Sequence, residues 1–92
     1  INGNNFLACI TTAQNALKDY PYTSMREDIS ILLLRAKHKL GSESVLEKKE
    51  ERMRETIDEY YAFKNEFPES KYMKEVEAIY KDASKYVKEL NE

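Results

Sequence analysis

The stretch Asp19-Tyr20-Pro21-Tyr22-Thr23 recurs 47 residues later in a similar form, as Glu66-Phe67-Pro68-Glu69-Ser70. Both stretches place an acid, an aromatic residue, a proline and a hydroxyl residue at matching positions. A proline lacks a backbone N–H and disfavours helical conformation at the residue before it. Each stretch therefore predicts that one helix ends and a turn follows. The hydroxyl residues are typical of helix starts, so we expect a new helix after each turn.

The composition of the chain predicts helices throughout. Its 92 residues are 35% charged and 41% apolar, and they include only two glycines and two prolines. A β sandwich or barrel needs a turn signal roughly every 10 residues, which four such residues do not supply. We therefore expect residues 1–92 to form one small all-α domain.

Apolar residues recur at steps of three and four within four segments. Ser24 with Glu27, and Ser44 with Glu47, have the spacing of a capping box. Gly41 stands where a left-handed residue would end a helix. The expected helices are Asn4–Asp19, Ser24–Leu40, Ser44–Glu66 and Lys71–Leu90.

The apolar positions on both sides of the two turns coincide on the same shift of 47 residues. This predicts a helical repeat in which 4–19 is the second helix of a truncated unit, 24–66 is a complete hairpin and 71–90 begins the next unit. Stacked hairpins of this kind form an α-solenoid, here of four antiparallel helices. We expect exposed apolar surface on the first helix, where a neighbour is missing, and self-association there. Cys9 falls within the apolar pattern, and we interpret it as a buried structural thiol.

Several classes of function have no support in the sequence. Fifteen basic and 17 acidic side chains give a net charge of −2, which does not attract nucleic acid. No apolar run approaches the roughly 20 residues that span a bilayer. His38 is the only histidine, and no Ser–His–acid set, Cys–His pair or phosphate-binding loop is present. We therefore expect no catalysis, cofactor or metal.

A few side chains are candidates for binding a protein partner. Tyrosine combines apolar area with a polar tip and is enriched at interfaces, although the rim of a core explains exposed tyrosines equally well. Ile31 and Leu34 widen the apolar face of the second helix, so they either line a partner groove or meet a missing helix. His38 lies on a solvated surface or contacts a partner. The candidates are Tyr22, Ile31, Leu34, His38, Tyr61 and Tyr86.

The turn Glu66-Phe67-Pro68-Glu69-Ser70-Lys71-Tyr72, preceded by Tyr60 and Phe63 and followed by Ala83, resembles a tetratricopeptide repeat. The pattern is similar to the repeats of outer-membrane assembly lipoproteins of the BamD (YfiO) type. The resemblance is closest over Asp58–Tyr86 and looser over Ala13–Ala36. The spacing of 47 residues exceeds the usual repeat of about 34, and the consensus Trp and Gly are missing.

This resemblance implies a non-catalytic scaffold at the periplasmic face of the bacterial outer membrane. It implies a lipid anchor upstream of these residues, and partners that include the barrel assembly subunit and other lipoproteins. Two further hypotheses remain open. One is a different tetratricopeptide adaptor, either similar to the Tol–Pal coordinator or cytoplasmic, that binds peptides or proteins in its groove. The other is a small helical enzyme or ligand carrier.

Overall fold

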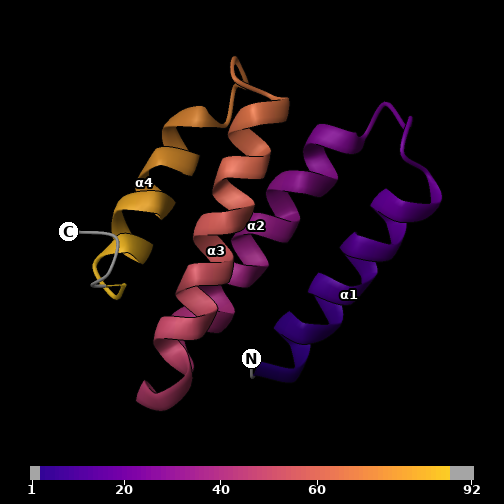
Figure 1. The fold of residues 1–92 in the computed structure, drawn as a ribbon. Coiled ribbons are helices and arrows are strands. Elements are labelled where there is room, and N and C mark those ends of the chain that lie inside the picture. The colour runs from indigo at the N-terminus through magenta and orange to yellow at the C-terminus, as the bar shows by residue number, and fades with distance from the viewer. Residues whose placement is uncertain (1–2, 88–92) are drawn as a thin grey trace.

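A computed structural model describes residues 3–87, and these form four α-helices (Figure 1). The all-α prediction is therefore confirmed, and each expected helix is present. The last helix ends at Ser84, earlier than expected, and the predicted end at Leu90 lies outside the described residues. The helices are α1 (Gly3–Asp19), α2 (Arg26–Ser42), α3 (Leu46–Glu66) and α4 (Met73–Ser84).

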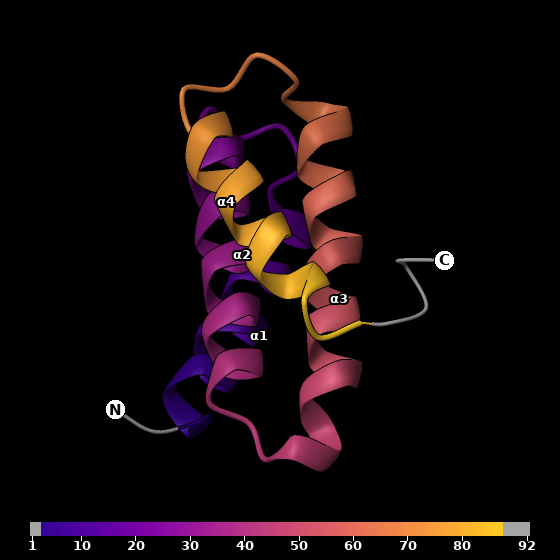
Figure 2. The ribbon, with the colours of Figure 1, turned by 90° about the vertical axis from the view of Figure 1, so that its left-hand side faces the viewer.

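Consecutive helices run antiparallel and pack side by side (Figure 1). In addition, α4 lies across both α2 and α3, as the second view shows (Figure 2). Helix α2 therefore contacts all three of the others, whereas α1 packs against α2 alone. This arrangement makes α2 the central helix of the domain.

The two proline turns have the same hydrogen bonds. In the first turn, Oγ1 of Thr23 accepts the backbone N–H of Met25 at 3.2 Å. In the second, Oγ of Ser70 accepts the backbone N–H of Tyr72 at 3.0 Å. Each hydroxyl residue thus holds the turn that precedes its helix. The backbone hydrogen bonds of the two turns also correspond. In both turns the hydroxyl residue donates its N–H to the aromatic residue before the proline, from Thr23 to Tyr20 and from Ser70 to Phe67. The carbonyl oxygen of the hydroxyl residue then accepts the first N–H of the next helix, from Arg26 and from Met73.

The expected capping boxes are wrong. The N-cap residues of α2 and α3 are Met25 and Val45, and neither side chain forms a cap hydrogen bond. Glu27 instead accepts a hydrogen bond from Ser70, so its carboxylate is engaged with another helix and does not return to its own. Ser44 donates to the carbonyl oxygen of Leu40 at 2.5 Å, which fastens the end of α2 instead of the start of α3.

Gly41 does not end α2 in a left-handed conformation, because it lies inside the helix and has no positive φ. A Cβ atom at this position would lie 3.1 Å from Sδ of Met53 on α3. The absence of a side chain at Gly41 therefore allows α2 and α3 to approach each other closely.

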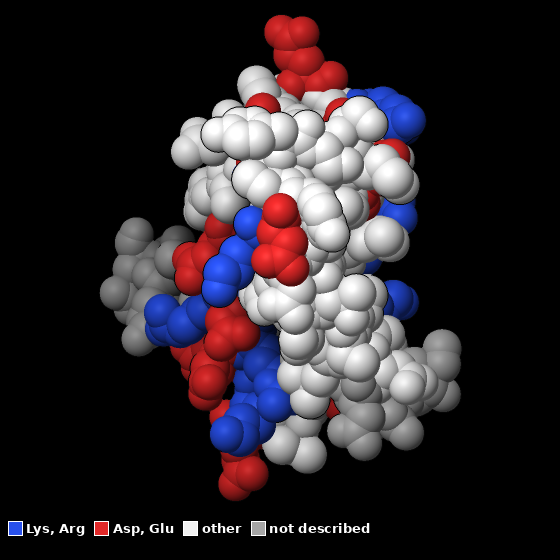
Figure 3. All heavy atoms as spheres, turned by 90° about the vertical axis from the view of Figure 1, so that its right-hand side faces the viewer, with Lys and Arg blue, Asp and Glu red and all other residues white. Residues whose placement is uncertain are grey.

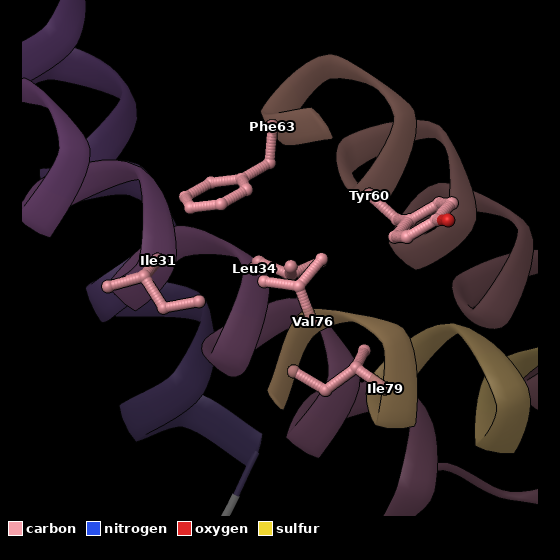
Figure 4. Close-up of a cluster of buried hydrophobic side chains, with 6 residues drawn as sticks. All are labelled: Ile31, Leu34, Tyr60, Phe63, Val76 and Ile79. Atoms are coloured by element: carbon pink, nitrogen blue, oxygen red, sulfur yellow. The ribbon is translucent and has the colours of Figure 1, made fainter. Parts of the chain in front are cut away.

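The core divides into clusters on different sides of α2. Leu33, Ala36 and Leu40 face α1. Ile31 and Leu34 face α3 and α4 and pack with buried residues of both (Figure 4). A third cluster joins α3 to the end of the described chain. The central cluster is Ile31, Leu34, Tyr60, Phe63, Val76 and Ile79, and the third is Met53, Ile57, Ala83 and Val87.

Several large apolar side chains near the helix ends are exposed. Tyr20 and Met25 flank the first turn and lie beyond the packed lengths of the helices. Leu46 is the first residue of α3 and projects past the end of α2. Cys9 is exposed as well, because it lies on a side of α1 that no described helix covers. The interpretation of Cys9 as a buried thiol is therefore wrong.

Candidate interaction surfaces

A set of polar contacts joins α2 to α3, to α4 and to the turn between them. Arg35 donates two hydrogen bonds to the carboxylate of Glu75, at 2.6 and 2.7 Å. This contact lowers the pKa of Glu75, because the guanidinium stabilises the charged carboxylate. Four further contacts tie polar side chains of α2 to other parts of the chain. They are Arg26 with Glu66, Ser70 with Glu27, Tyr72 with Asp28 at 2.8 Å, and Lys37 with Glu59 at 3.0 Å.

His38 belongs to this same set of contacts. One of its ring nitrogens lies 2.6 Å from a carboxylate oxygen of Asp82 on α4, and the side chain is largely buried. The sequence placed His38 on a solvated surface or in contact with a partner. The structure gives it a partner within the chain, which holds α2 against α4.

Ile31 and Leu34 are not available to a partner. Their exposed fractions are 1% and 0%, because both insert between α3 and α4 (Figure 4). The expectation that they line a partner groove or await a missing helix is therefore wrong. Helix α2 has neighbours on both sides, and the sequence pattern alone did not separate its two buried faces.

Tyr61 lies in a cluster of three tyrosines formed by α3 and α4. Tyr60 and Tyr80 stack with ring centroids 4.5 Å apart, and the ring of Tyr61 meets both at its edge. Burial raises the pKa of Tyr60, whose hydroxyl donates to Glu77 and accepts from Lys64. Tyr61 stays 52% exposed, so the cluster presents one accessible ring at the surface.

Tyr22 and Tyr86 lie in two other parts of the molecule. Tyr22 is 97% exposed in the turn between α1 and α2. Tyr86 follows α4, and Nζ of Lys49 lies 5.0 Å from the centre of its ring. Within residues 3–87, no ring contact joins any two of Tyr22, Tyr61 and Tyr86. The candidate tyrosines therefore do not form one common surface.

A hollow with a mostly apolar lining lies between α1 and α2, and we call it the α1–α2 groove. It has a volume of about 440 Å³. Helix α1 carries no charged side chain from Gly3 to Leu17, and Figure 3 shows the broad, mostly uncharged face on its side of the molecule. The groove is lined by Asn5, Ala8, Cys9, Thr12, Ala13, Ala16, Ile29 and Leu32.

Residues of this groove were not among the predicted site residues, although a signal was present. The first helix was expected to leave apolar surface exposed, and this is confirmed, since Leu7 on α1 is 45% exposed. The uncharged run of α1 indicates on which side of the molecule this surface lies. Self-association through this surface stays a prediction.

The described residues contain no group of three or more His, Cys, Asp or Glu side chains arranged to hold a metal ion. Among the four described helices, none has the length and apolar character needed to cross a bilayer. No model of a known family matches the chain, and no curated protein or solved structure matches it. The geometry of the chain itself is therefore the basis for a functional proposal.

Proposed function

We propose that this chain is a non-catalytic protein–protein interaction scaffold built from stacked helical hairpins of the tetratricopeptide kind. The observation that carries the proposal is that the two proline turns form the same hydrogen bonds. Thr23 and Ser70 accept equivalent hydrogen bonds, and the backbone bonds on both sides match. Two turns with the same sequence features and the same bonds support a common repeated unit.

The order of helix contacts supports the same proposal. Each helix packs on its neighbour in the chain, and α2 also contacts α4, the first helix of the following unit. In stacked-hairpin proteins each unit contacts only its neighbours, and the stack presents an extended surface to partners. Exposed aromatic side chains such as Tyr22 and Tyr61 are suited to such contacts.

We further propose, from the sequence resemblance alone, that the scaffold belongs to the machinery that assembles β-barrel proteins in the outer membrane. The barrel assembly subunit and other lipoproteins are then its partners, and it works at the periplasmic face. The segment Asp58–Tyr86 carries this proposal. A different tetratricopeptide adaptor is the alternative, and the two differ in the partner that they bind.

The test is site-specific photo-crosslinking in living cells. A photoreactive amino acid replaces Tyr22, Tyr61 or Tyr86, which are all exposed, and Ser42 serves as an exposed control position away from them. Crosslinks to the barrel assembly subunit are the expected result. Crosslinks to a Tol–Pal component or to a cytoplasmic protein would favour the alternative adaptor. No protein crosslink from any of the three tyrosine positions would contradict the scaffold proposal at these surfaces.

A further inference from the structure

The α1–α2 groove has a counterpart between α3 and α4, which we call the α3–α4 groove. This second groove is occupied by a helix of the same chain. Helix α2 lies in the α3–α4 groove and inserts Ile31 and Leu34 into it (Figure 4). A shift of 47 residues relates five of the eight residues that line the α1–α2 groove to buried residues of α3 and α4, whereas Asn5, Ala8 and Thr12 fall on the unburied Arg52, Glu55 and Glu59. The corresponding pairs are Cys9 with Thr56, Ala13 with Tyr60, Ala16 with Phe63, Ile29 with Val76, and Leu32 with Ile79.

The two linings differ in what covers them. The five residues of the α3–α4 groove are all at most 6% exposed, because α2 lies over them. In the α1–α2 groove Leu32 is 48% exposed and Cys9 is exposed. Two of the five matched positions, Leu32 and Cys9, are thus exposed, whereas their counterparts Ile79 and Thr56 are buried. Ala13, at 7% exposure, is buried like its counterpart Tyr60. The filled groove therefore shows what kind of group the open one accommodates.

The charges beside the filled groove identify further features of its occupant. Helix α2 carries Arg26 and Arg35, nine residues apart, which pair with Glu66 and Glu75. The same shift of 47 residues relates these two glutamates to Asp19 and Asp28 beside the open groove. Both aspartates are exposed, and Asp28 also accepts a hydrogen bond from the hydroxyl of Tyr72. An occupant with two basic residues nine positions apart, as in α2, would place one cation near Asp19 and one near Asp28.

The size of the lining residues indicates one difference between the two occupants. Ala13 and Ala16 stand where the filled groove has Tyr60 and Phe63. The open groove therefore lacks two aromatic rings. A close-packed interface fills such space, so the occupant must carry larger side chains than the isoleucine and leucine of α2.

We propose that the α1–α2 groove binds an amphipathic helix from outside residues 1–92. This helix presents two aromatic residues three positions apart and two basic residues nine positions apart. The inference rests on the proposed function and deepens it, because it names the surface and the chemical character of one partner. A second copy of this chain is a poorer occupant. The helix with the two basic residues is α2, but it has isoleucine and leucine at the two aromatic positions, and both are already buried.

Synthetic peptides with the sequence of residues 24–43 test this proposal. In the first peptide, Ile31→Phe and Leu34→Phe supply the aromatic pair. A second peptide is the matched control, with Ile31→Asp and Leu34→Asp. A third keeps the aromatic pair but carries Arg26→Glu and Arg35→Glu. None of the peptides contains cysteine, so the single cysteine of the protein, Cys9, reports on the groove without interference.

The measurement is the rate at which a thiol reagent modifies Cys9 as peptide is added. Only the free protein reacts, so the aromatic peptide should slow the reaction about tenfold when nine-tenths of the protein is bound. The aspartate peptide should have no effect, and the glutamate peptide should bind more weakly. In the protein, Leu32→Glu should abolish the protection. Leu46→Glu, at an exposed position outside the groove, should not.

A fusion protein that joins the aromatic peptide to residue 3 through the sequence of residues 44–49 keeps the spacing between α2 and the filled groove and raises the local concentration of the peptide. If Cys9 remains fully reactive in this fusion, the proposal is wrong. Protection of Cys9 without peptide that increases with protein concentration would instead identify a second copy as the occupant, and would also overturn it. If either result is obtained while the crosslinks from Tyr22, Tyr61 or Tyr86 are still found, the scaffold function is retained and only the proposal for the α1–α2 groove is wrong.

Discussion

Gly41 on α2 packs directly against the side chain of Met53 on α3. A Cβ atom at Gly41 would lie 3.1 Å from Sδ of Met53, which is fully buried and therefore restricted in how far it can move. The missing side chain of Gly41 thus leaves room for Met53, and a substitution at Gly41 measures how much this contributes to the free energy of unfolding.

Replacement of Gly41 with valine should destabilise the domain. The added side chain meets Met53 in a packed core, where such insertions cost about 1–3 kcal/mol in the free energy of unfolding. Ser42→Val is the matched control, because Ser42 is the next residue of α2 but is exposed. Urea denaturation followed by circular dichroism gives both values. Because valine has a higher helix propensity than glycine, a loss at Gly41 no larger than the loss at Ser42 would contradict the role of the contact with Met53.

Leu34 and Leu32 are two positions apart on α2 but should respond very differently to truncation. Leu34 is fully buried between α3 and α4, whereas Leu32 is 48% exposed beside the α1–α2 groove. Leu34→Ala should lower the free energy of unfolding by about 2–5 kcal/mol. Since full burial of a leucine contributes about 1.5–3 kcal/mol, Leu32→Ala should cost roughly 1 kcal/mol. If Leu34→Ala unfolds the domain, Leu34→Val provides a milder change, and a loss no larger than that of Leu32→Ala would contradict the position of α2.

The hydroxyl groups of the two turns should contribute similarly to stability. Thr23→Val and Ser70→Ala each remove an acceptor for a backbone N–H, and we expect each to cost about 0.5–2 kcal/mol. The loss should be larger for Ser70, because its hydroxyl also donates to Glu27. Ser24→Ala is the control, since Ser24 is exposed and caps no helix. Thermal unfolding compares the three variants, and a loss at Ser24 equal to the other two would place the cap one residue later.

The contact between Arg35 and Glu75 predicts a dependence on pH with a definite sign. Arg35 lowers the pKa of Glu75 from its ordinary value of 4.5, so the folded state favours the charged carboxylate. The stabilisation is then complete well above pH 4.5 and is lost as the pH falls through the lower pKa of the folded state. Because both side chains are about two-fifths exposed, Glu75→Gln should cost less than about 1 kcal/mol at pH 7.

Two measurements check this prediction. The difference in unfolding free energy between Glu75→Gln and the unchanged protein should shrink on acidification, and it should shrink in about 1 M salt as screening increases. Glu55→Gln, at an exposed position of α3, is the control and should show neither trend. A difference that grows as the pH falls would reverse the sign and contradict the role of Arg35.

The sequence predicts the helices and turns well because their signals are local. Pro21 and Pro68 end helices wherever they occur, and the apolar spacing of each segment identifies a helix without knowledge of its neighbours. The sequence does not predict which side of α2 meets which helix, so Ile31 and Leu34 were placed at a partner surface. Whether a face is covered depends on the arrangement of the other helices.

The polar contacts of α2 were missed for a similar reason. Arg35 and Glu75 are 40 residues apart, and His38 and Asp82 are 44 apart. No local pattern identifies such partners. The α1–α2 groove combines both cases, since the uncharged run of α1 was visible in the sequence, but the hollow itself requires the position of α2.

The attachment of α1 to a single neighbour has a consequence for the motions of the domain. Helix α2 contacts three helices, whereas α1 contacts only α2. Detachment of α1 therefore leaves the cluster of Ile31, Phe63 and Val76 intact. Segments of this kind open locally at a lower free energy than the whole domain. Backbone amides in the middle of α1 should accordingly exchange with deuterium faster than those of α2 and α3, and binding of a helix in the α1–α2 groove should remove most of that difference.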